Sequence, residues 1–351
     1  MKKSRIHFEA MEARSVDALP AGQGWQYEPK WDGFRCVLTR DDHVVALYSK
    51  SGQDLGRYFP EVVAAALTLR EKCFVLDGEI VVPVDGKFSF DDLLQRIHPA
   101  ASRVKKLAEE TPALFLAFDL LKKGKTEVAA APLIKRRPQL EAFAARYFSD
   151  ADLFRLSPAS LKLKDARHWL SSAGGGSDGV IAKRLELPYQ AGNRDGMQKI
   201  KRYRSADCVI GGFRYGENLQ TGRKVVGSLL LGLYDAEGLL HHVGFSSGIK
   251  AKEKAALTDK LEALKHDRSF TGNAPGGPSR WSTKRSSEWQ PVKPEYVVEV
   301  SYDHFTGGRF RHGTSILRWR PDKKPSQCTM EQVKQKVARK LLNSVAAAIR
   351  V

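Results

Sequence analysis

Cysteine is scarce in this chain and is not clustered. Four cysteines occur among 351 residues, at positions 36, 73, 208 and 328, and none of them forms a CxxC pair. Closely spaced cysteines are typical of zinc sites, and an even set in a short secreted chain is typical of a disulfide framework. The sequence therefore favours neither, and four scattered thiols suit a reducing cytosol.

Long apolar runs are also missing. No stretch approaches the ~20 apolar residues that a membrane-spanning helix needs. The basic N-terminal segment is not followed by the apolar run of a secretory signal. Three glycines at 174–176 lack the spacing and the Lys-Ser/Thr pair of a P-loop, so any phosphate must be held by other residues. We expect a soluble, cytoplasmic protein with no membrane partner.

Acidic residues are too few to balance the basic ones. The chain has 58 Lys and Arg against 40 Asp and Glu, for a net charge of +18 and a pI near 9.7. Residues 205–351 hold 24 basic and 14 acidic residues, net +10, while the longer 1–204 holds 34 and 26, net +8. Such an excess indicates a polyanionic partner, although an inert basic surface has the same composition.

The length and the residue patterns predict two domains with a boundary near Arg204. Before it, short β-rich runs separated by Gly and Asp predict antiparallel hairpins, and 113–121 is an apolar run typical of a buried central strand. Helices are predicted after Pro60 and Ser89, the second interrupted at Pro99, and within 132–148 and 161–173.

After the boundary the pattern changes to several short strands separated by Gly-rich turns, which is typical of a small barrel. Helices are predicted over 251–266 and 331–349. We therefore expect one domain over residues 1–204 and a β-barrel domain over 205–351.

The segment Glu28-Pro29-Lys30-Trp31-Asp32-Gly33-Phe34-Arg35 places a lysine among apolar neighbours, with an acid and an arginine at fixed offsets. A lysine must lose its proton to attack phosphorus, and burial and nearby positive charge favour that loss. Taken alone, a KxDG sequence is more often an exposed charged turn.

Other segments supply complementary groups. Glu79 lies between apolar neighbours in 76–81, an unfavourable place for a carboxylate without a partner. Asp178 leads a similar run that ends at Lys183, and two such carboxylates suit a divalent cation of the Mg²⁺ type. Lys199 and Lys201 alternate on a strand, so their ammonium groups share a face that suits a phosphate chain.

Together and in this order, these segments resemble the covalent nucleotidyltransferase superfamily of DNA ligases, RNA ligases and messenger-RNA capping enzymes. They are most similar to the small bacterial ATP-dependent DNA ligases of the ligase C type, from about Met11 into the terminal helix. The resemblance implies an α+β fold. It predicts an ATP-grasp-like adenylation (nucleotidyltransferase) domain with antiparallel sheets flanked by helices over 1–204, followed by an OB-fold barrel over 205–351.

The resemblance also implies roles for single residues. KWDGFR matches the nucleophile motif KxDGxR, which makes Lys30 the adenylated residue and Arg35 a nucleotide contact. Glu28 then reads the adenine edge, and Glu79 contacts ribose or metal. Phe118 occupies the place of an aromatic ring that stacks on adenine; without the companion motifs, a core Phe in an apolar strand would be the better interpretation.

Three further motifs match with conservative departures. In Ser49-Lys50-Ser51-Gly52, Lys50 replaces the usual Arg, so it contacts phosphate without the bidentate fork of a guanidinium. In the metal motif Asp178 replaces the commoner Glu, and Lys183 is a further ATP contact. Lys199 and Lys201 match the motif that grips the α-phosphate, with Met197 in place of its usual aromatic.

In the second domain, 310–313 and the RWRPDK run resemble the last motif of the family, which orients the pyrophosphate leaving group when the barrel closes over the nucleotide. An ordinary basic surface strand is the alternative. The residues concerned are Arg318, Arg320, Asp322 and Lys323.

The implied reaction uses ATP with Mg²⁺ or Mn²⁺ to seal 5′-phosphate/3′-hydroxyl nicks in double-stranded DNA during repair, through lysyl-AMP. A hinge near 204–207 lets the barrel turn from nucleotide to DNA, and Arg214, Arg223 and Lys224 are DNA contacts by composition. We expect a monomer, with a repair polymerase or end-binding protein as candidate partner. The alternatives are an RNA ligase, a capping-type guanylyltransferase and a non-catalytic nucleic-acid-binding protein.

Overall fold

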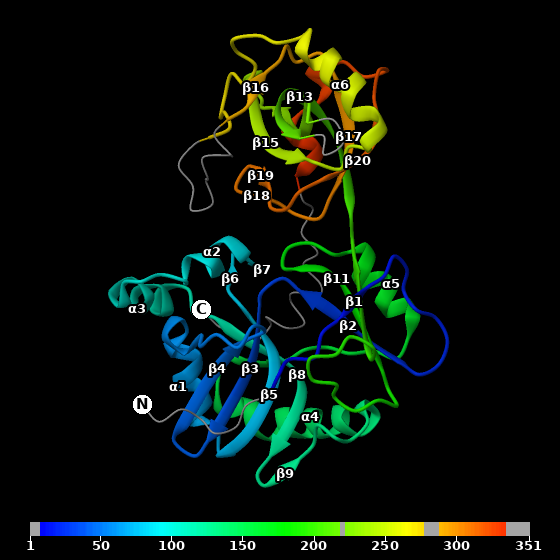
Figure 1. The fold of residues 1–351 in the computed structure, drawn as a ribbon. Helices are drawn as coiled ribbons and strands as arrows, with labels where there is room; N and C mark the ends of the chain where they lie inside the picture. The colour runs from blue at the N-terminus through cyan, green and yellow to red at the C-terminus, as the bar shows by residue number, and fades with distance from the viewer. Residues whose placement is uncertain (1–7, 218–221, 277–287, 335–351) are drawn as a thin grey trace. The chain divides into compact units, whose positions relative to one another are not determined.

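A computed structural model describes residues 8–217, 222–276 and 288–334 of the chain. These residues form two compact units, one over 8–202 and one over 203–334 (Figure 1). Among the helices in these ranges, none is long and apolar enough to cross a membrane.

The first unit contains a six-stranded sheet in the order β10-β8-β5-β3-β4, with β9 paired to β8. Its pairs are antiparallel except for β10 and β8, which run parallel. The strands are β3 (Phe34–Asp41), β4 (Val44–Ser49), β5 (Cys73–Val81), β8 (Leu114–Lys123), β9 (Thr126–Glu127) and β10 (Phe154–Leu156). The predicted buried strand at 113–121 is confirmed as β8, whose residues 114–121 are all buried.

A four-stranded sheet in the order β1-β12-β11-β2 faces the first sheet. Its pairs are antiparallel except the short β1–β12 pair at its edge. The predicted antiparallel sheets are thus confirmed apart from two parallel pairs at sheet edges, β10–β8 and β1–β12. The strands are β1 (Arg14–Ser15), β2 (Trp25–Trp31), β11 (Ser177–Arg184) and β12 (Met197–Lys201), and a separate hairpin joins β6 (Pro83–Val84) to β7 (Lys87–Phe88).

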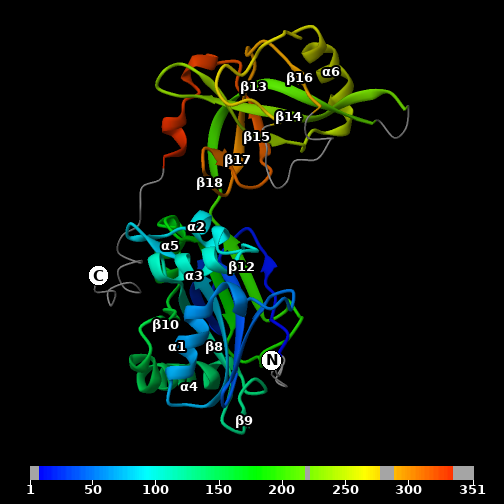
Figure 2. The ribbon, with the colours of Figure 1, turned by 90° about the vertical axis from the view of Figure 1, so that its left-hand side faces the viewer.

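Helices cover the outer faces of the two sheets. Apolar residues of α1 and α4 form one core with the outer face of the six-stranded sheet, and Figure 2 shows both helices there. Helix α5 packs on β2 and β11 from the other side. The bounds are α1 (Pro60–Thr68), α2 (Phe90–Gln95), α3 (Ala101–Glu110), α4 (Leu133–Tyr147) and α5 (Leu163–Ser171), with short 3-10 turns at η1 (Gly56–Tyr58) and η2 (Phe148–Asp150).

Local chemistry explains where these helices begin. Pro60 occupies the first position of α1, where its missing N–H costs no hydrogen bond. The Ser89 hydroxyl accepts from the Asp92 N–H and so caps α2. The predicted interruption near Pro99 is confirmed, because α2 ends at Gln95 and α3 begins at Ala101.

The second unit is a strongly bent sheet in the order β15-β14-β13-β17-β20, with β16 on β13 and a small β18–β19 hairpin. Its edge strands approach where the Thr314 N–H donates to the Phe245 carbonyl and the Ser246 hydroxyl donates to the Thr314 carbonyl, which closes the barrel. This is the predicted OB fold. The strands are β13 (Arg204–Glu217), β14 (Lys224–Tyr234), β15 (Leu240–Ser246), β16 (Gln290–Pro291), β17 (Val297–Tyr302), β18 (Phe305–Thr306), β19 (Arg309–Phe310) and β20 (Ser315–Trp319).

Three predicted features of the second unit need comment. The helix predicted over 251–266 is a 3-10 turn, η3 (Ala251–Glu253), followed by α6 (Lys254–Glu262). The helix predicted over 331–349 lies outside the described residues from 335 onward. The described start of this range belongs to a 3-10 turn, η5 (Met330–Val333), and an earlier 3-10 turn is η4 (Pro325–Gln327). The hinge predicted at 204–207 falls inside β13, where these residues pair with β17, and only 202 and 203 separate β12 from β13.

Gly179 in β11 is required by the close approach of β12. A Cβ at this position would lie 1.9 Å from the Ile200 carbonyl oxygen, and backbone cannot move away as a flexible side chain can. We predict that Gly179→Ala lowers the melting temperature of the chain by roughly 5 to 10 °C, measured by circular dichroism.

Gly248→Ala is the control, because Gly248 has open space around its Cβ position and no positive φ. Equal melting temperatures for the two variants would contradict this interpretation of Gly179.

Candidate functional site

The register of β2, β11 and β12 sets the candidate site residues in two rows. Lys30 lies opposite Gly179, which lies opposite Lys201. Two residues along, Glu28 lies opposite Ile181, which lies opposite Lys199. Ile181 packs toward the six-stranded sheet while Val180 and Ala182 pack toward α5, so by alternation both rows face the space between the sheets.

Asp178 lies at a β-bulge that changes the direction of its side chain. The pairing of β11 with β2 shifts between Ser177 and Gly179, which leaves Asp178 as the extra residue. Regular alternation would send Asp178 to the α5 side with Val180. Instead its carboxylate contacts the Lys30 Nζ at 2.9 and 3.1 Å and the Lys201 Nζ at 3.6 Å.

Lys30, like Lys201, is a partly exposed member of this cluster. Its side chain is 23% exposed, whereas that of Asp178 is 5% exposed, so the amine can meet a ligand while its partner stays covered. The turn after β2 depends on Gly33, where a Cβ would lie 2.3 Å from the Ile80 carbonyl oxygen. The lack of a side chain at Gly33 therefore allows β5 to lie against the turn that follows Lys30.

A cavity of about 310 Å³ lies between the two sheets beside Lys30. Both sheets, the turn after β4 and the segment before β1 contribute to its wall. The predicted site residues that line it are Glu28, Lys30, Arg35, Lys50, Glu79, Phe118, Lys183 and Lys199.

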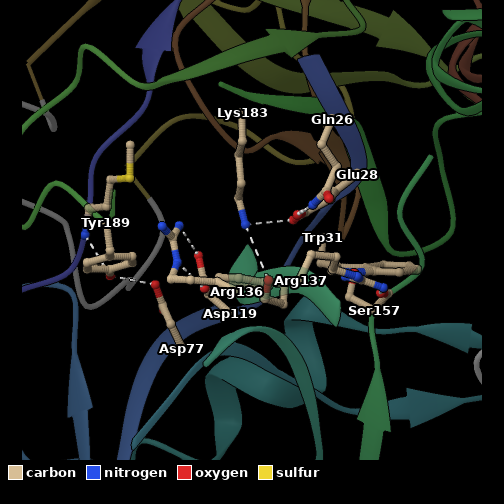
Figure 3. Close-up of polar contacts among 12 residues, drawn as sticks. Gln26, Glu28, Trp31, Asp77, Asp119, Arg136, Arg137, Ser157, Lys183 and Tyr189 are labelled. Atoms are coloured by element: carbon tan, nitrogen blue, oxygen red, sulfur yellow. Dashed lines mark hydrogen bonds and ion pairs between the residues drawn. The ribbon is translucent and has the colours of Figure 1, made fainter. Parts of the chain in front are cut away.

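Two buried polar side chains, Glu28 and Lys183, line the cavity. Figure 3 shows the contact between them. The Lys183 Nζ lies 2.9 Å from Glu28 Oε2 and 4.6 Å from the centroid of the Phe118 ring. Gln26 Nε2 donates to Glu28 Oε1 at 2.8 Å. Glu28 and Lys183 are both buried, and their contact together with that of Gln26 holds the Glu28 carboxylate in one orientation.

Arg35 is held over Phe118 by a buried carboxylate. Its Nε and Nη2 donate to the two oxygens of Asp77, each at 2.5 Å, and its Cζ lies 4.6 Å from the Phe118 ring centroid. Asp77 is fully buried, and burial of this kind makes a charge-assisted bidentate pair strong. The pair fixes the guanidinium at the cavity wall.

Glu79 lies in the same strand face as Asp77 and lines the cavity. Burial raises the pKa of the Glu79 carboxyl from about 4.5 to about 8, while Lys30 and Arg35 partly oppose this rise. A carboxyl in that state takes a proton near neutral pH unless a cation compensates its charge.

At the mouth of the cavity Glu12 joins two exposed cations. Its carboxylate lies 3.1 Å from the Lys50 Nζ and 2.6 Å from the Arg194 Nε. Hydrogen bonds from Lys50 and then Arg194 lower the pKa of Glu12. Burial, followed by repulsion from Lys30 and other cations, lowers the pKa of Lys199. Positive charge is therefore concentrated on this side of the cavity.

Oxygen donors suitable for a divalent cation are present at the site. Carboxylates are the ligands that Mg²⁺ prefers, and Glu79 and Asp178 both lie near Lys30, the first in the cavity wall and the second in direct contact. The raised pKa of Glu79 indicates a carboxylate whose charge the described residues leave incompletely compensated. The donor set therefore fits Mg²⁺ or Mn²⁺.

The four predicted leaving-group residues lie in the second unit, on and just after β20. Arg320 Nη1 and Lys323 Nζ donate to the two oxygens of Asp207, at 2.8 and 2.6 Å. Arg318 Nε donates to Glu299 at 2.7 Å, and Arg320 also pairs with Asp322 at 2.8 Å. Each cation thus has a carboxylate partner within its own unit.

Four residues of the site were not predicted: Glu12, Asp77, Tyr189 and Arg194. Asp77 had a signal, because it precedes Glu79 by two residues in β5 and alternation places both on one face. The other three lie in segments without periodic pattern, so only the folded chain brings Glu12 and Arg194 to the cavity and Tyr189 to Asp77.

Two family models match the chain. The ATP dependent DNA ligase domain matches residues 10–201, and the ATP dependent DNA ligase C terminal region matches residues 222–323. Among solved structures, one described as a structure-function analysis of Lig E DNA ligases aligns with a TM-score of 0.54 at 16% identity, over 90% of this chain and 100% of that chain. That likeness shows the fold alone.

Curated relatives match over 90% or more of this chain. The chain is 44% identical to DNA ligase C2 of Mycolicibacterium smegmatis, over 92% of this chain and 93% of that protein. It is 41% identical to DNA ligase C of Mycobacterium tuberculosis, over 93% of each. It is 34% identical to the multifunctional non-homologous end joining DNA repair protein LigD of Mycobacterium tuberculosis, over 90% of this chain and 39% of that protein.

The raised pKa of Glu79 predicts a pH-dependent stability. Between its ordinary value near 4.5 and about 8, the folded chain keeps a proton that the unfolded chain releases, so rising pH favours unfolding. We expect the wild type to lose melting temperature relative to Glu79→Gln as the pH rises from 5 to 8, with metal removed by EDTA.

Glu109→Gln is the control, because Glu109 is exposed on α3. A difference between wild type and Glu79→Gln that stays constant across this pH range would contradict the prediction.

Proposed function

The chain belongs to the family of ATP-dependent DNA ligases, of the bacterial ligase C type, and on that basis we propose that Lys30 carries AMP as it seals nicks. The observation that supports this role is the position of Lys30. Its amine contacts a covered carboxylate, Asp178, and projects into a cavity lined by cations and by the Glu28–Lys183 and Arg35–Phe118 pairs. We also propose that the adenylation domain spans residues 1–204 and the OB-fold domain residues 205–351.

In the first step the neutral amine of Lys30 attacks the α-phosphorus of ATP. A phosphorus–nitrogen bond forms, the bond to the bridging oxygen breaks, and pyrophosphate leaves with that electron pair. Lys199 and Lys201 contact the α-phosphate. Lys50 and Lys183 contact other parts of the nucleotide. Glu28 binds the edge of the adenine, and Phe118 stacks on its face. Cations fixed before the reaction stabilise the charge that develops on the phosphoryl oxygens.

Glu79 and Asp178 would hold Mg²⁺ or Mn²⁺. When bound there, the ion supplies positive charge that offsets the Asp178 carboxylate and stabilises the phosphoryl oxygens. Asp178 pairs with the Lys30 Nζ, and attack on phosphorus requires the amine with a free electron pair.

The leaving pyrophosphate is the proposed ligand of Arg318, Arg320 and Lys323, with Asp322 aligning Arg320. These side chains pair with carboxylates of the second unit. To bind pyrophosphate, each of these cations therefore has to exchange its carboxylate partner for a phosphate oxygen. Each cation then has an anionic partner before and after the exchange.

Nicked double-stranded DNA is the proposed substrate, with AMP passing to the 5′-phosphate and the 3′-hydroxyl then expelling AMP. The net charge of +18 supports a large phosphate contribution to affinity, which falls with salt. The similarity to LigD, a non-homologous end joining DNA repair protein, supports a role in repair. We further propose a monomer that works with a repair polymerase or an end-binding protein.

The central test follows the label from ATP carrying ³²P in its α-phosphate. With Mg²⁺, we expect the denatured wild-type chain to retain label, Lys30→Ala to retain none because the nucleophile is gone, and Lys164→Ala, altered at an exposed residue of α5, to retain the wild-type amount. Label from GTP alone, or no label on the wild type, would refute the proposal.

Asp178→Asn tests the proposed metal site. We expect the rate of lysyl-AMP formation to fall at least about 100-fold and the Mg²⁺ concentration for half-maximal rate to rise, because a neutral amide is a weaker ligand. Asp17→Asn, at an exposed turn, should behave as wild type. An unchanged Mg²⁺ dependence in Asp178→Asn would remove this residue from the metal site.

A further inference from the structure

Tyr189 lies in the segment that joins β11 to β12, outside the motifs described above, and its side chain is buried. Its hydroxyl donates to Asp77 Oδ2 at 2.6 Å and accepts the Met11 N–H at 2.8 Å (Figure 3). Its backbone N–H donates to the Ala129 carbonyl at 2.9 Å. The Arg136 guanidinium lies 5.9 Å from the centroid of its ring. The hydroxyl therefore cannot turn away from Asp77 without losing several contacts.

The Asp77 carboxylate connects Tyr189 to the cavity. It is fully buried and accepts three hydrogen bonds, two from Arg35 and one from Tyr189. A buried carboxylate takes the orientation in which its donors are best satisfied. The Tyr189 hydroxyl thus helps to set the plane of the carboxylate, and the carboxylate sets the plane of the Arg35 guanidinium.

Met11 forms a second connection between the same residues. Arg35 Nη2 donates to the Met11 carbonyl at 3.4 Å, and the Met11 N–H donates to the Tyr189 hydroxyl. Met11 and Arg35 both line the cavity. One hydroxyl therefore contacts both residues that accept hydrogen bonds from the Arg35 guanidinium, although Tyr189 itself does not line the cavity.

We propose that Tyr189 is a positioning residue for ATP binding, which acts by holding Asp77 and Met11 so that the Arg35 guanidinium meets the nucleotide in a fixed orientation. This inference rests on the proposed function, in which Arg35 contacts ATP. Phe at this position keeps the ring and its packing and removes only the hydroxyl. Arg35 then keeps its ion pair with Asp77 but loses the support that fixes the direction of the pair.

The test measures the equilibrium affinity for ATP by titration calorimetry. All chains also carry Lys30→Ala, so that no AMP is transferred during the titration. We expect Tyr189→Phe to weaken ATP binding by about tenfold, the size typical of one hydrogen bond to a charged group. Tyr27→Phe is the matched control, since the buried Tyr27 hydroxyl donates to the Pro20 carbonyl in the same unit, and it should bind ATP as the parent does.

A double-mutant cycle separates positioning from general damage. If Tyr189 acts through Arg35, then adding Tyr189→Phe to Arg35→Ala changes ATP affinity no further. In the chain with Lys30 intact, the same variant should raise the KM for ATP in lysyl-AMP formation and leave kcat near the wild-type value. An equal loss of affinity with and without Arg35, or unchanged affinity in Tyr189→Phe, would overturn the inference.

Asp77→Asn provides a second route if Tyr189→Phe does not fold. The amide keeps one oxygen acceptor but weakens the hold on Arg35, so ATP affinity should again fall, and parent-like affinity would overturn the inference. Failure of the proposed function has a different signature. A wild-type chain that forms no lysyl-AMP would refute the function, whereas a wild type that adenylates while Tyr189→Phe matches it refutes only the role of Tyr189.

Discussion

The close pairing of β2, β11 and β12 is the constraint on which the site depends. Because side chains alternate along a strand, this register sends Glu28, Lys30 and Lys199 toward the same space between the sheets. Gly179 at the centre lets the strands approach, since a side chain there would meet the Ile200 carbonyl. The bulge beside it turns Asp178 to Lys30. The lysine and its carboxylate partner meet only because this register is kept.

The charged side chains around the cavity form ion pairs that differ in burial. Glu28 and Lys183 form a covered pair, and the covered Asp77 carboxylate holds Arg35. The Arg35 and Lys30 side chains are both partly exposed, and Asp178 is the covered partner of Lys30. Taking charges out of water is costly, and the covered pairs offset that cost by close geometry. Fixed pairs then need little rearrangement when a polyanion enters, which is the condition under which charge is most effective in stabilising a transition state.

Much of the fold and the site was predictable, for reasons that differ between residues. A continuous apolar run predicted β8, and the helix expected after Ser89 with an interruption at Pro99 corresponds to α2 and α3. Lys199 and Lys201 followed from the two-residue period of a strand. Tyr189, Glu12 and Arg194 did not, because residues in irregular segments have no period to reveal which way they point. The bulge at Asp178 was also hidden, since it depends on how β11 pairs with β2.

The sequence by itself determined the order of the motifs, the residue types available for nucleotide chemistry and the change from mixed α+β to barrel pattern near residue 204. These properties depend on local propensity and period, which neighbouring residues carry. Only the tertiary structure decided that Asp77 would hold Arg35, that Tyr189 would hold Asp77 from 112 positions away, and that Asp178 would turn toward Lys30. Those contacts arise from strand register and burial, which are properties of the whole packed unit and of no single segment.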